Sequence, residues 1–322
     1  MIVNCPSPIE PLVFRSRDKL VYSPDEPSGP AFLRVGESVE VYIKREDLIH
    51  PDFGGNKWRK LKYNLEAFRT GGYGHLVTFG GPFSNHIAAT ASACHHYNIP
   101  CIGIIRGSYI DETNPTLLKA NANGMQLKHV AKCDYKIKEE AAEIKDIISS
   151  FDNPLVIPEG GNNQLALKGA AEVVEEVRGQ DLKPDYIVLS GGTGTTASGI
   201  ISATQTEKIL VMNALKNAGL TAAIDDSLET PKYNWTVNND YHFGRFAKVT
   251  KELVDFINGF YKTYGLLLDP IYNGKAMYGL FDLIHKDYFP SGSKILYVYT
   301  GGLQGVTAYN YRCKREEMRV VV

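Results

Sequence analysis

The chain has 322 residues, of which 43% are hydrophobic and 22% are charged, and its formal net charge is −1 at pH 7. This length is enough for two closely joined lobes, and the composition is typical of a globular protein. A nearly neutral chain has no broad basic field that would attract nucleic acid or an anionic membrane, so neither is expected as a partner. No apolar run approaches the roughly 20 residues that a membrane helix needs.

The five cysteines are spread along the chain without a Cys-x-x-Cys pair. This spacing fits neither a zinc site nor a disulfide framework, and it is typical of a reducing compartment. Residues 1–14 lack a basic leader followed by an apolar stretch, so the cytoplasm is the expected location. His86, His95 and His96 share one expected helix, but no carboxylate is spaced to complete a metal site, and no metal is expected.

From about residue 75, short β-rich runs alternate with longer helical periods. Strands are expected at 75–79, 101–106, 126–131, 155–158, 186–190 and 295–299, and helices at 87–96, 115–123, 136–149 and 164–178. This alternation predicts parallel sheets with helices on both faces, in which ligands bind beyond the carboxyl ends of the strands. Glycine clusters follow four of these strands, at 80–81, 160–161, 191–194 and 301–302. Residues 205–244 lack the pattern, and they could form either a loop-rich cover over the site or a surface insertion.

Lys57 follows two glycines and an asparagine, at the start of a helical period that runs through Trp58, Leu61 and Leu65. The field at a helix start disfavours a cation, so this is a poor position for a structural lysine. The same field and partial burial would lower the pKa of Lys57 and favour the free amine that a Schiff base needs. Lys60, one turn further along, is interpreted as a solvated surface residue.

Residues 190–199 read Ser-Gly-Gly-Thr-Gly-Thr-Thr-Ala-Ser-Gly, between an apolar strand and an expected helix. Small residues let backbone N–H groups converge on an anion, and the threonine hydroxyls add hydrogen-bond donors. The segment lacks the ending of a nucleoside-triphosphate loop, and its glycines miss the dinucleotide spacing. A single phosphate monoester is therefore the better ligand, and a plain glycine-rich turn is the alternative.

A third motif, Gly-Gly-Pro-Phe-Ser-Asn-His at residues 80–86, places three polar side chains at the start of the next expected helix. Ser84 and Asn85 could bind a carboxylate or a ring hydroxyl. The alternative is that one of them only caps the helix.

Five motifs, in order between about residues 40 and 305, resemble the family that contains D-cysteine desulfhydrase and 1-aminocyclopropane-1-carboxylate deaminase. They are Gly-Gly-Asn-Lys at 54–57, Gly-Gly-x-x-Ser-Asn-His at 80–86, the loop at 190–199, Leu-Asp-Pro-Ile-Tyr-x-Gly-Lys at 268–275 and Tyr-Thr-Gly-Gly at 299–302. That family belongs to the fold-type-II pyridoxal-phosphate enzymes, like the tryptophan synthase β chain. The resemblance implies a two-domain α/β fold in which each domain is an open, mostly parallel sheet with helices on both faces. Residues 1–64 plus 154–322 would form the large cofactor-binding domain, and residues 65–153 the small domain.

The resemblance also implies pyridoxal 5′-phosphate as the cofactor, with Lys57 as the residue that binds it covalently and moves the substrate α-proton. It implies Ser84 and Tyr272 as further catalytic residues, and a substrate-binding set of Ser84, Asn85, His86 and Tyr272. The implied cofactor-binding set is Lys57, Asn85, Gly192, Thr193, Gly194, Thr195, Thr196, Asn273 and Thr300. A small amino acid is the implied substrate, and a homodimer the implied assembly.

Departures from the family pattern bear on the substrate. Deaminases that open the cyclopropane ring carry glutamate at the position of Asn273, leucine at that of Thr300 and a tyrosine at that of Phe246. The family's arginine after Ser-Asn-His-x is Ala88 here. Desulfhydrases carry small hydroxyl residues at positions 273 and 300, so Thr300 favours them and Asn273 fits neither group. We therefore expect α,β-elimination from a D-cysteine-like substrate, giving a keto acid, ammonia and sulfide, rather than ring opening.

A neutral Asn273 near the cofactor's ring nitrogen would leave that nitrogen largely unprotonated, and the weaker electron sink favours elimination of a good leaving group. The alternatives are another lyase or racemase reaction on the same scaffold, including the deaminase itself. An alternative from a different class is a non-catalytic ligand-binding relative, against which Lys57 and the phosphate loop argue.

Overall fold

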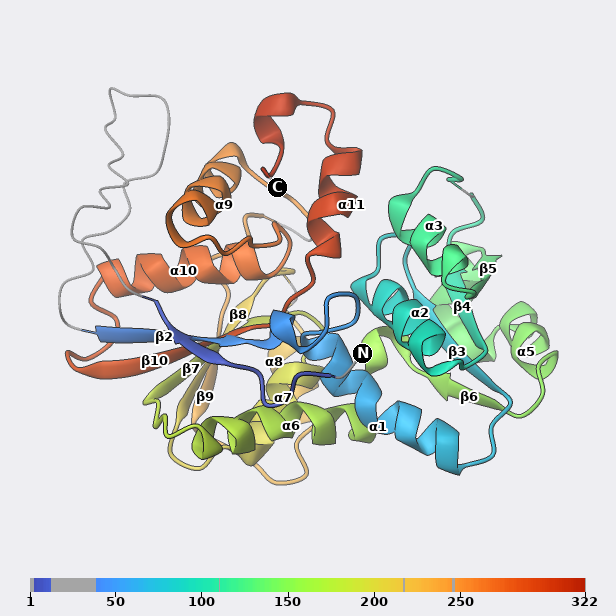
Figure 1. The fold of residues 1–322 in the computed structure, drawn as a ribbon, viewed down its shortest axis with the longest axis horizontal. Coiled ribbons are helices and arrows are strands. Elements are labelled where there is room, and N and C mark those ends of the chain that lie inside the picture. Colours follow the sequence, from blue (N-terminus) through green and yellow to red (C-terminus); the bar gives the residue numbers. More distant parts are fainter. Residues whose placement is uncertain (1–2, 13–38, 110, 217, 245–246, 322) are drawn as a thin grey trace.

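Two separate β-sheets organise the chain (Figure 1). The computed structural model describes residues 3–12, 39–109, 111–216, 218–244 and 247–321. The six-stranded sheet has the order β1 (Ile9–Pro11), β2 (Val39–Arg45), β10 (Ser293–Tyr299), β7 (Tyr186–Gly191), β8 (Lys208–Asn213) and β9 (Trp235–Asn238). The four-stranded sheet has the order β5 (Gln126–Val130), β4 (Cys101–Arg106), β3 (His75–Gly80) and β6 (Pro154–Ile157). All paired strands are parallel except β1 with β2.

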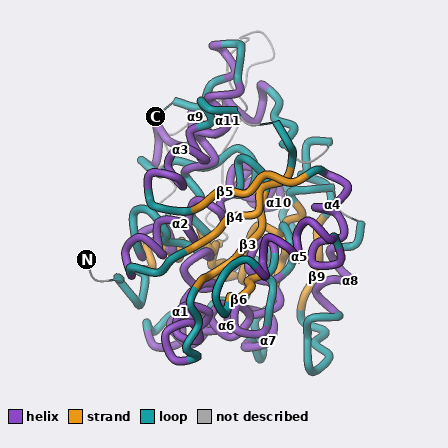
Figure 2. The backbone as a smooth tube through the Cα atoms, turned by 90° about the vertical axis from the view of Figure 1, so that its right-hand side faces the viewer, coloured by secondary structure: helices purple, strands orange, loops and turns teal. Residues whose placement is uncertain are grey.

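Helices cover both faces of each sheet. On the larger sheet, one face packs against α6 (Gln164–Gly179), α7 (Thr195–Ala203) and α8 (Leu220–Asp225), and the other against α9 (Lys251–Tyr264) and α10 (Asn273–His285). On the smaller sheet, α1 (Asn56–Thr70), α2 (Asn85–Tyr97) and α3 (Pro115–Ala122) lie on one face, and α4 (Lys132–Ile137) and α5 (Ala142–Ser149) on the other (Figure 2). Near the C-terminus, α11 (Gln304–Arg312) contacts α3 and α2. Short 3-10 helices span Glu46–Ile49, Lys138–Glu140, Glu159–Gly161 and Glu316–Met318.

This arrangement confirms the expected two-domain α/β fold with open, mostly parallel sheets. The strand at 101–106 and the helix that begins at Pro115 are where the sequence predicts them. Asn114 caps that helix, because its Oδ1 accepts hydrogen bonds from the N–H groups of Thr116 (2.9 Å) and Leu117 (3.1 Å). The domain boundaries remain a prediction, with one change. Residues 154–157 form β6, which pairs with β3, so we place the second boundary after Ile157.

The expected continuous helix at 136–149 is wrong. It breaks at Lys138, whose φ of 51° lies in the left-handed region, and α4 ends there while α5 begins only at Ala142. The side chain of Lys138 makes two contacts at the break. Its Nζ lies 3.4 Å from the centroid of the Tyr135 ring and 3.1 Å from a carboxylate oxygen of Glu159, and both contacts stabilise the chain in this conformation.

Both interpretations of residues 205–244, as a cover and as a surface insertion, are also wrong. This stretch supplies β8 and β9, which extend the larger sheet, and α8, which packs against it. The buried run Ile209–Met212 was the available signal, because four apolar residues in a row are typical of a central parallel strand. None of the described helices is both long and apolar enough to cross a membrane.

Candidate active site

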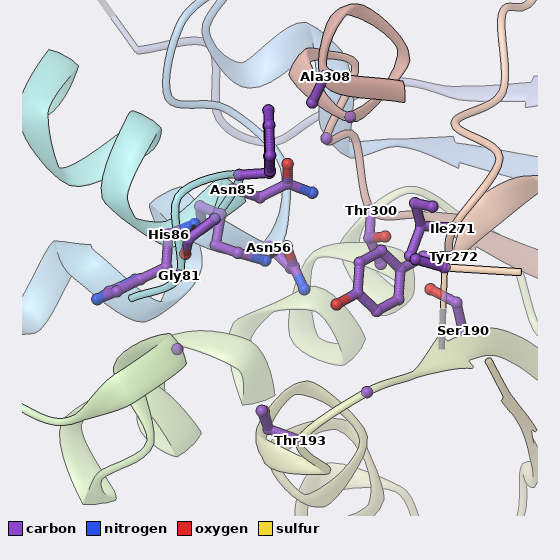
Figure 3. Close-up of a pocket in the computed structure, with 18 of the residues that line it drawn as sticks. Asn56, Gly81, Asn85, His86, Ser190, Thr193, Ile271, Tyr272, Thr300 and Ala308 are labelled. Carbon is purple, nitrogen blue, oxygen red and sulfur yellow. Dashed lines mark hydrogen bonds between the residues drawn. The ribbon is translucent and has the colours of Figure 1, made fainter. Parts of the chain in front are cut away.

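A cavity of about 480 Å³ lies between the two sheets (Figure 3). The segments that follow β3, β6, β7 and β10 line it, so the glycine clusters do meet at the carboxyl ends of the strands, as the alternation predicts. The start of α1 forms a further wall. The cavity wall includes Lys57, Ser84, Asn85, His86, Gly192, Thr193, Gly194, Thr196, Tyr272, Asn273 and Thr300. The volume is in the range of small-molecule and cofactor sites.

Lys57 is the second residue of α1, and a close backbone contact fixes its position. Gly55, with a φ of 70°, precedes the helix, and a Cβ built on it would lie 2.1 Å from the carbonyl oxygen of Thr300. Only glycine therefore fits there, and the N–H of Asn56 donates to the same carbonyl over 3.1 Å. The Lys57 amine donates to Asn56 Oδ1 over 2.8 Å. Burial lowers the pKa of Lys57 to about 8, although the carboxylate of Asp269 acts in the opposite direction.

We expect the rate at which pyridoxal phosphate, the cofactor that the resemblance implies, reacts with the cofactor-free protein to rise with pH and to level off above about pH 8. Only the neutral amine attacks an aldehyde, and a Lys57 pKa of about 8 makes the neutral form the majority above that pH. Following the absorbance of the lysine-bound cofactor at a series of pH values measures this rate, with Lys62→Ala as the control. A rate that climbs without levelling to about pH 10, as for an ordinary lysine, would contradict the lowered pKa.

The interpretation of Lys60 as a solvated surface residue is wrong, because Lys60 is buried. Its side chain is 3% exposed and lines the cavity. Its Nζ lies 2.9 Å from the carbonyl oxygen of Gly160 and 3.4 Å from Thr193 Oγ1. Burial, and secondarily the charge of Lys57, hold the pKa of Lys60 well below its usual value. The three-residue spacing between Lys57 and Lys60 could have predicted that Lys60 faces the cavity, since residues i and i+3 of a helix share a face.

The loop after β7 approaches α1 directly. Asn56 Nδ2 donates to Thr196 Oγ1 over 3.0 Å, so the helix start that carries Lys57 contacts the start of α7. Gly194, with a φ of 93°, turns the chain into that helix. Thr195 is the one predicted loop residue outside the cavity wall, and its hydroxyl donates to Asn162 Oδ1 over 2.8 Å. The N-terminus of α7 together with the Lys60 amine would suit a phosphate group.

Ser84 both caps α2 and lines the cavity. Its Oγ accepts hydrogen bonds from the N–H groups of His86 (3.2 Å) and Ile87 (3.3 Å). His86 is held in the wall, where its Nε2 lies 2.8 Å from Thr78 Oγ1. Because that hydroxyl donates to the carbonyl of Ile157 over 2.9 Å, Nε2 must carry the hydrogen. Burial, then Lys57 and Lys60, lower the pKa of His86 to about 3, so His86 is neutral at physiological pH.

Asn273 is fully buried, and its whole amide is engaged. Its Nδ2 donates to Asp269 Oδ2 and to the carbonyl of Gly301, both over 2.8 Å. Its Oδ1 accepts from the Tyr297 hydroxyl (3.1 Å) and from the Thr300 hydroxyl (3.2 Å) and N–H (3.3 Å). Both amide hydrogens of Asn273 are therefore used within the protein.

Asp269 organises the turn that carries Tyr272. Its Oδ1 accepts from the N–H groups of Ile271 (3.0 Å) and Tyr272 (2.8 Å), and its Oδ2 from that of Asn273 (2.9 Å). Burial raises the pKa of the Asp269 carboxyl, while these bonds oppose the rise.

Burial likewise raises the pKa of Tyr272 to about 12, so its neutral phenol can donate a hydrogen bond. Figure 3 shows this ring in the cavity with Thr300 and Ser190 nearby.

The charges of the lining suit an anionic ligand. Four basic side chains line the cavity (Lys57, Lys60, Arg106 and Arg312), whereas Glu159 is the single carboxylate among the described lining residues. Among the residues that the structure describes, no group of three or more His, Cys, Asp or Glu side chains could hold a metal ion. A buried amine beside a candidate phosphate site, between two mostly parallel sheets, is the arrangement that the resemblance to fold-type-II pyridoxal-phosphate enzymes implies.

Comparison with known proteins agrees with this class. A family model described as "Pyridoxal-phosphate dependent enzyme" matches residues 31–301. A protein of Pyrococcus horikoshii described as a putative 1-aminocyclopropane-1-carboxylate deaminase is 32% identical over 285 residues, covering 84% of this chain and 86% of the relative. The 1-aminocyclopropane-1-carboxylate deaminase of Pseudomonas syringae pv. tomato is 26% identical over 324 residues, covering 91% and 95%.

Among solved structures, an "ACC deaminase homologue" is 27% identical, with a TM-score of 0.77, and covers 95% of this chain and 92% of its own. The chain belongs to the pyridoxal-phosphate dependent enzyme family, within the group of 1-aminocyclopropane-1-carboxylate deaminase homologues. Its cofactor is pyridoxal 5′-phosphate. Lys57 would hold the cofactor covalently, and the loop after β7 with Lys60 would hold its phosphate.

Proposed function

We propose that this enzyme catalyses α,β-elimination from D-cysteine or a closely similar amino acid. The overall reaction converts D-cysteine and water to pyruvate, ammonia and hydrogen sulfide. The carbon–sulfur bond breaks, the α-proton is removed, and water supplies the oxygen of the keto group. The observation that carries the proposal is the neutral, fully engaged Asn273 beside the Thr300 hydroxyl in the cavity wall.

Asn273 matters because it cannot supply a hydrogen bond to the cofactor's ring nitrogen. Both of its amide hydrogens are already donated, to Asp269 and Gly301, and the Thr300 hydroxyl donates to Asn273 Oδ1. None of these side-chain groups has a hydrogen to spare for a ring nitrogen. A ring nitrogen without a proton is a weaker electron sink, and this favours loss of a good leaving group such as a thiolate.

When bound, pyridoxal phosphate supplies the electrophilic carbon for the substrate amine and delocalises the electron pair left at the α-carbon. Lys57 supplies an amine whose lowered pKa of about 8 suits proton removal near neutral pH. Ser84 Oγ already accepts two backbone hydrogen bonds, so its own hydrogen is left to donate to a substrate carboxylate. The neutral Tyr272 phenol lies in the same cavity and can donate to the leaving group.

Deamination of 1-aminocyclopropane-1-carboxylate is the second candidate, because the relatives compared above carry that description. In our proposal, Asn273 and Thr300 disfavour it, since ring-opening members have glutamate and leucine at these positions. Phe246, the third departure, lies outside the described residues. We also retain the homodimer and the cytoplasmic location as predictions, and sedimentation and localisation of the tagged protein test them.

The test is a product assay on the cofactor-loaded enzyme. Hydrogen sulfide, ammonia and keto acid are measured with D-cysteine, L-cysteine, D-serine and 1-aminocyclopropane-1-carboxylate. We expect sulfide, ammonia and pyruvate in equal amounts, fastest with D-cysteine. Release of ammonia and 2-oxobutanoate from the cyclopropane substrate, with no sulfide from either cysteine, would instead assign the deaminase. Inversion of an added amino acid without release of ammonia would assign a racemase.

A further inference from the structure

We propose that Gln304 is a positioning residue that holds the amide of Asn85 with its nitrogen toward the cofactor site. Gln304 begins α11, on the segment that follows β10, and its side chain reaches α2 and α3 on the smaller sheet. The inference rests on a cofactor-binding role that the resemblance implies for Asn85, as the hydrogen-bond donor to the cofactor's ring oxygen.

The orientation of the Gln304 amide follows from a backbone carbonyl. The side-chain atom 3.2 Å from the Phe83 carbonyl oxygen must be the NH₂ group, because a carbonyl can only accept a hydrogen bond. The amide oxygen of Gln304 therefore faces the other way, where the Thr116 hydroxyl donates to it over 2.8 Å. Thr116 is 3% exposed, so this hydroxyl is shielded from competing water.

The NH₂ group of Gln304 also fixes the orientation of the Asn85 amide. Gln304 Nε2 lies 2.5 Å from the side-chain atom of Asn85 that must be its acceptor, Oδ1. The NH₂ group of Asn85 is left over, and no described residue accepts a hydrogen bond from it. Figure 3 shows this nitrogen on the side of the amide that faces Thr300 and Tyr272. A Cβ at Gly302 would lie 2.9 Å from Asn85 Nδ2, so only glycine leaves room for the amide in this position.

The orientation has a chemical consequence. An NH₂ group facing the ring oxygen stabilises its negative charge and so favours loss of the proton from the lysine-bound cofactor. If the Asn85 amide turned over, its oxygen would face that negative charge instead. The hydrogen-bond chain Thr116–Gln304–Asn85 prevents this exchange, and it joins the end of the larger sheet to α2 and α3.

The test is a pH titration of the absorbance of the lysine-bound cofactor in the full-length holoenzyme. In Gln304→Glu a carboxylate replaces the donor, so the Asn85 NH₂ group turns toward it and the Asn85 oxygen turns toward the cofactor. We expect the titration midpoint to rise by about one pH unit relative to the wild type. Gln304→Met keeps the bulk without either hydrogen-bonding group, and it is expected to give a smaller shift in the same direction.

Two further variants separate positioning from general packing. Asn85→Ala measures the full effect of losing the donor. Tyr311→Phe removes another contact between α11 and the smaller sheet, in which the Tyr311 hydroxyl lies 3.0 Å from Asp111 Oδ2, and it is expected to leave the midpoint unchanged. The proposal is overturned if both Gln304 variants titrate like the wild type while Asn85→Ala shifts, or if Tyr311→Phe shifts as much as Gln304→Glu. If Asn85→Ala does not shift either, the proposed role of Asn85 fails as well.

Discussion

Replacing Lys57 with alanine is expected to lower turnover by at least about 10³-fold, because in our proposal the substitution removes both the group that binds the cofactor covalently and the base that takes the α-proton. The variant should also lose the absorbance band of the lysine-bound cofactor. Turnover assays at saturating substrate and an absorbance spectrum measure the two effects.

Lys62→Ala is the matched control for Lys57→Ala. Lys62 lies on the same helix, but its side chain is 37% exposed and pairs with Glu172 at the surface. Such pairs contribute at most about 1 kcal/mol, so the control should fold and turn over like the wild type. If Lys57→Ala retained turnover while binding the cofactor, Lys57 would not be the base, and the proposed reaction would need another group.

Replacing Lys60 with methionine is expected to affect the cofactor-free and cofactor-loaded proteins in opposite directions. In the loaded enzyme a charge-assisted hydrogen bond to the phosphate is lost, so cofactor affinity should fall about 10- to 100-fold. In the cofactor-free protein the buried Lys60 amine, which lies beside Gly160 and Thr193, has no carboxylate partner among the described residues to offset the cost of its charge. Its removal should therefore raise the free energy of unfolding by about 1 kcal/mol.

Cofactor titration and thermal unfolding of both forms measure these changes, and Lys62→Met is the control on the same helix. An unchanged cofactor affinity in Lys60→Met would mean that the phosphate lies elsewhere. A cofactor-free Lys60→Met variant that unfolds more readily would show that the hydrogen bond to the Gly160 carbonyl outweighs the cost of burying the charge.

The sequence by itself determined the features that depend on neighbouring residues. The alternation of apolar runs with helical periods predicted the strands 101–106 and 186–190 and the parallel sheets. Asn114 and Pro115 predicted a helix start, and the glycines before Lys57 predicted the turn into α1. Once parallel sheets are expected, the residues after each strand must gather at one edge, which is why most of the predicted site residues line one cavity.

Only the tertiary structure decided which surfaces meet. Lys60 resembles any surface lysine in the sequence, and it is buried because α1 packs near the loop after β7. The amide of Asn273 is fully engaged because Asp269, Gly301, Tyr297 and Thr300 converge on it from the turn before α10 and the end of β10. The physical reason is that periodicity and capping are local properties, whereas burial and hydrogen-bond partners depend on residues far apart in the chain.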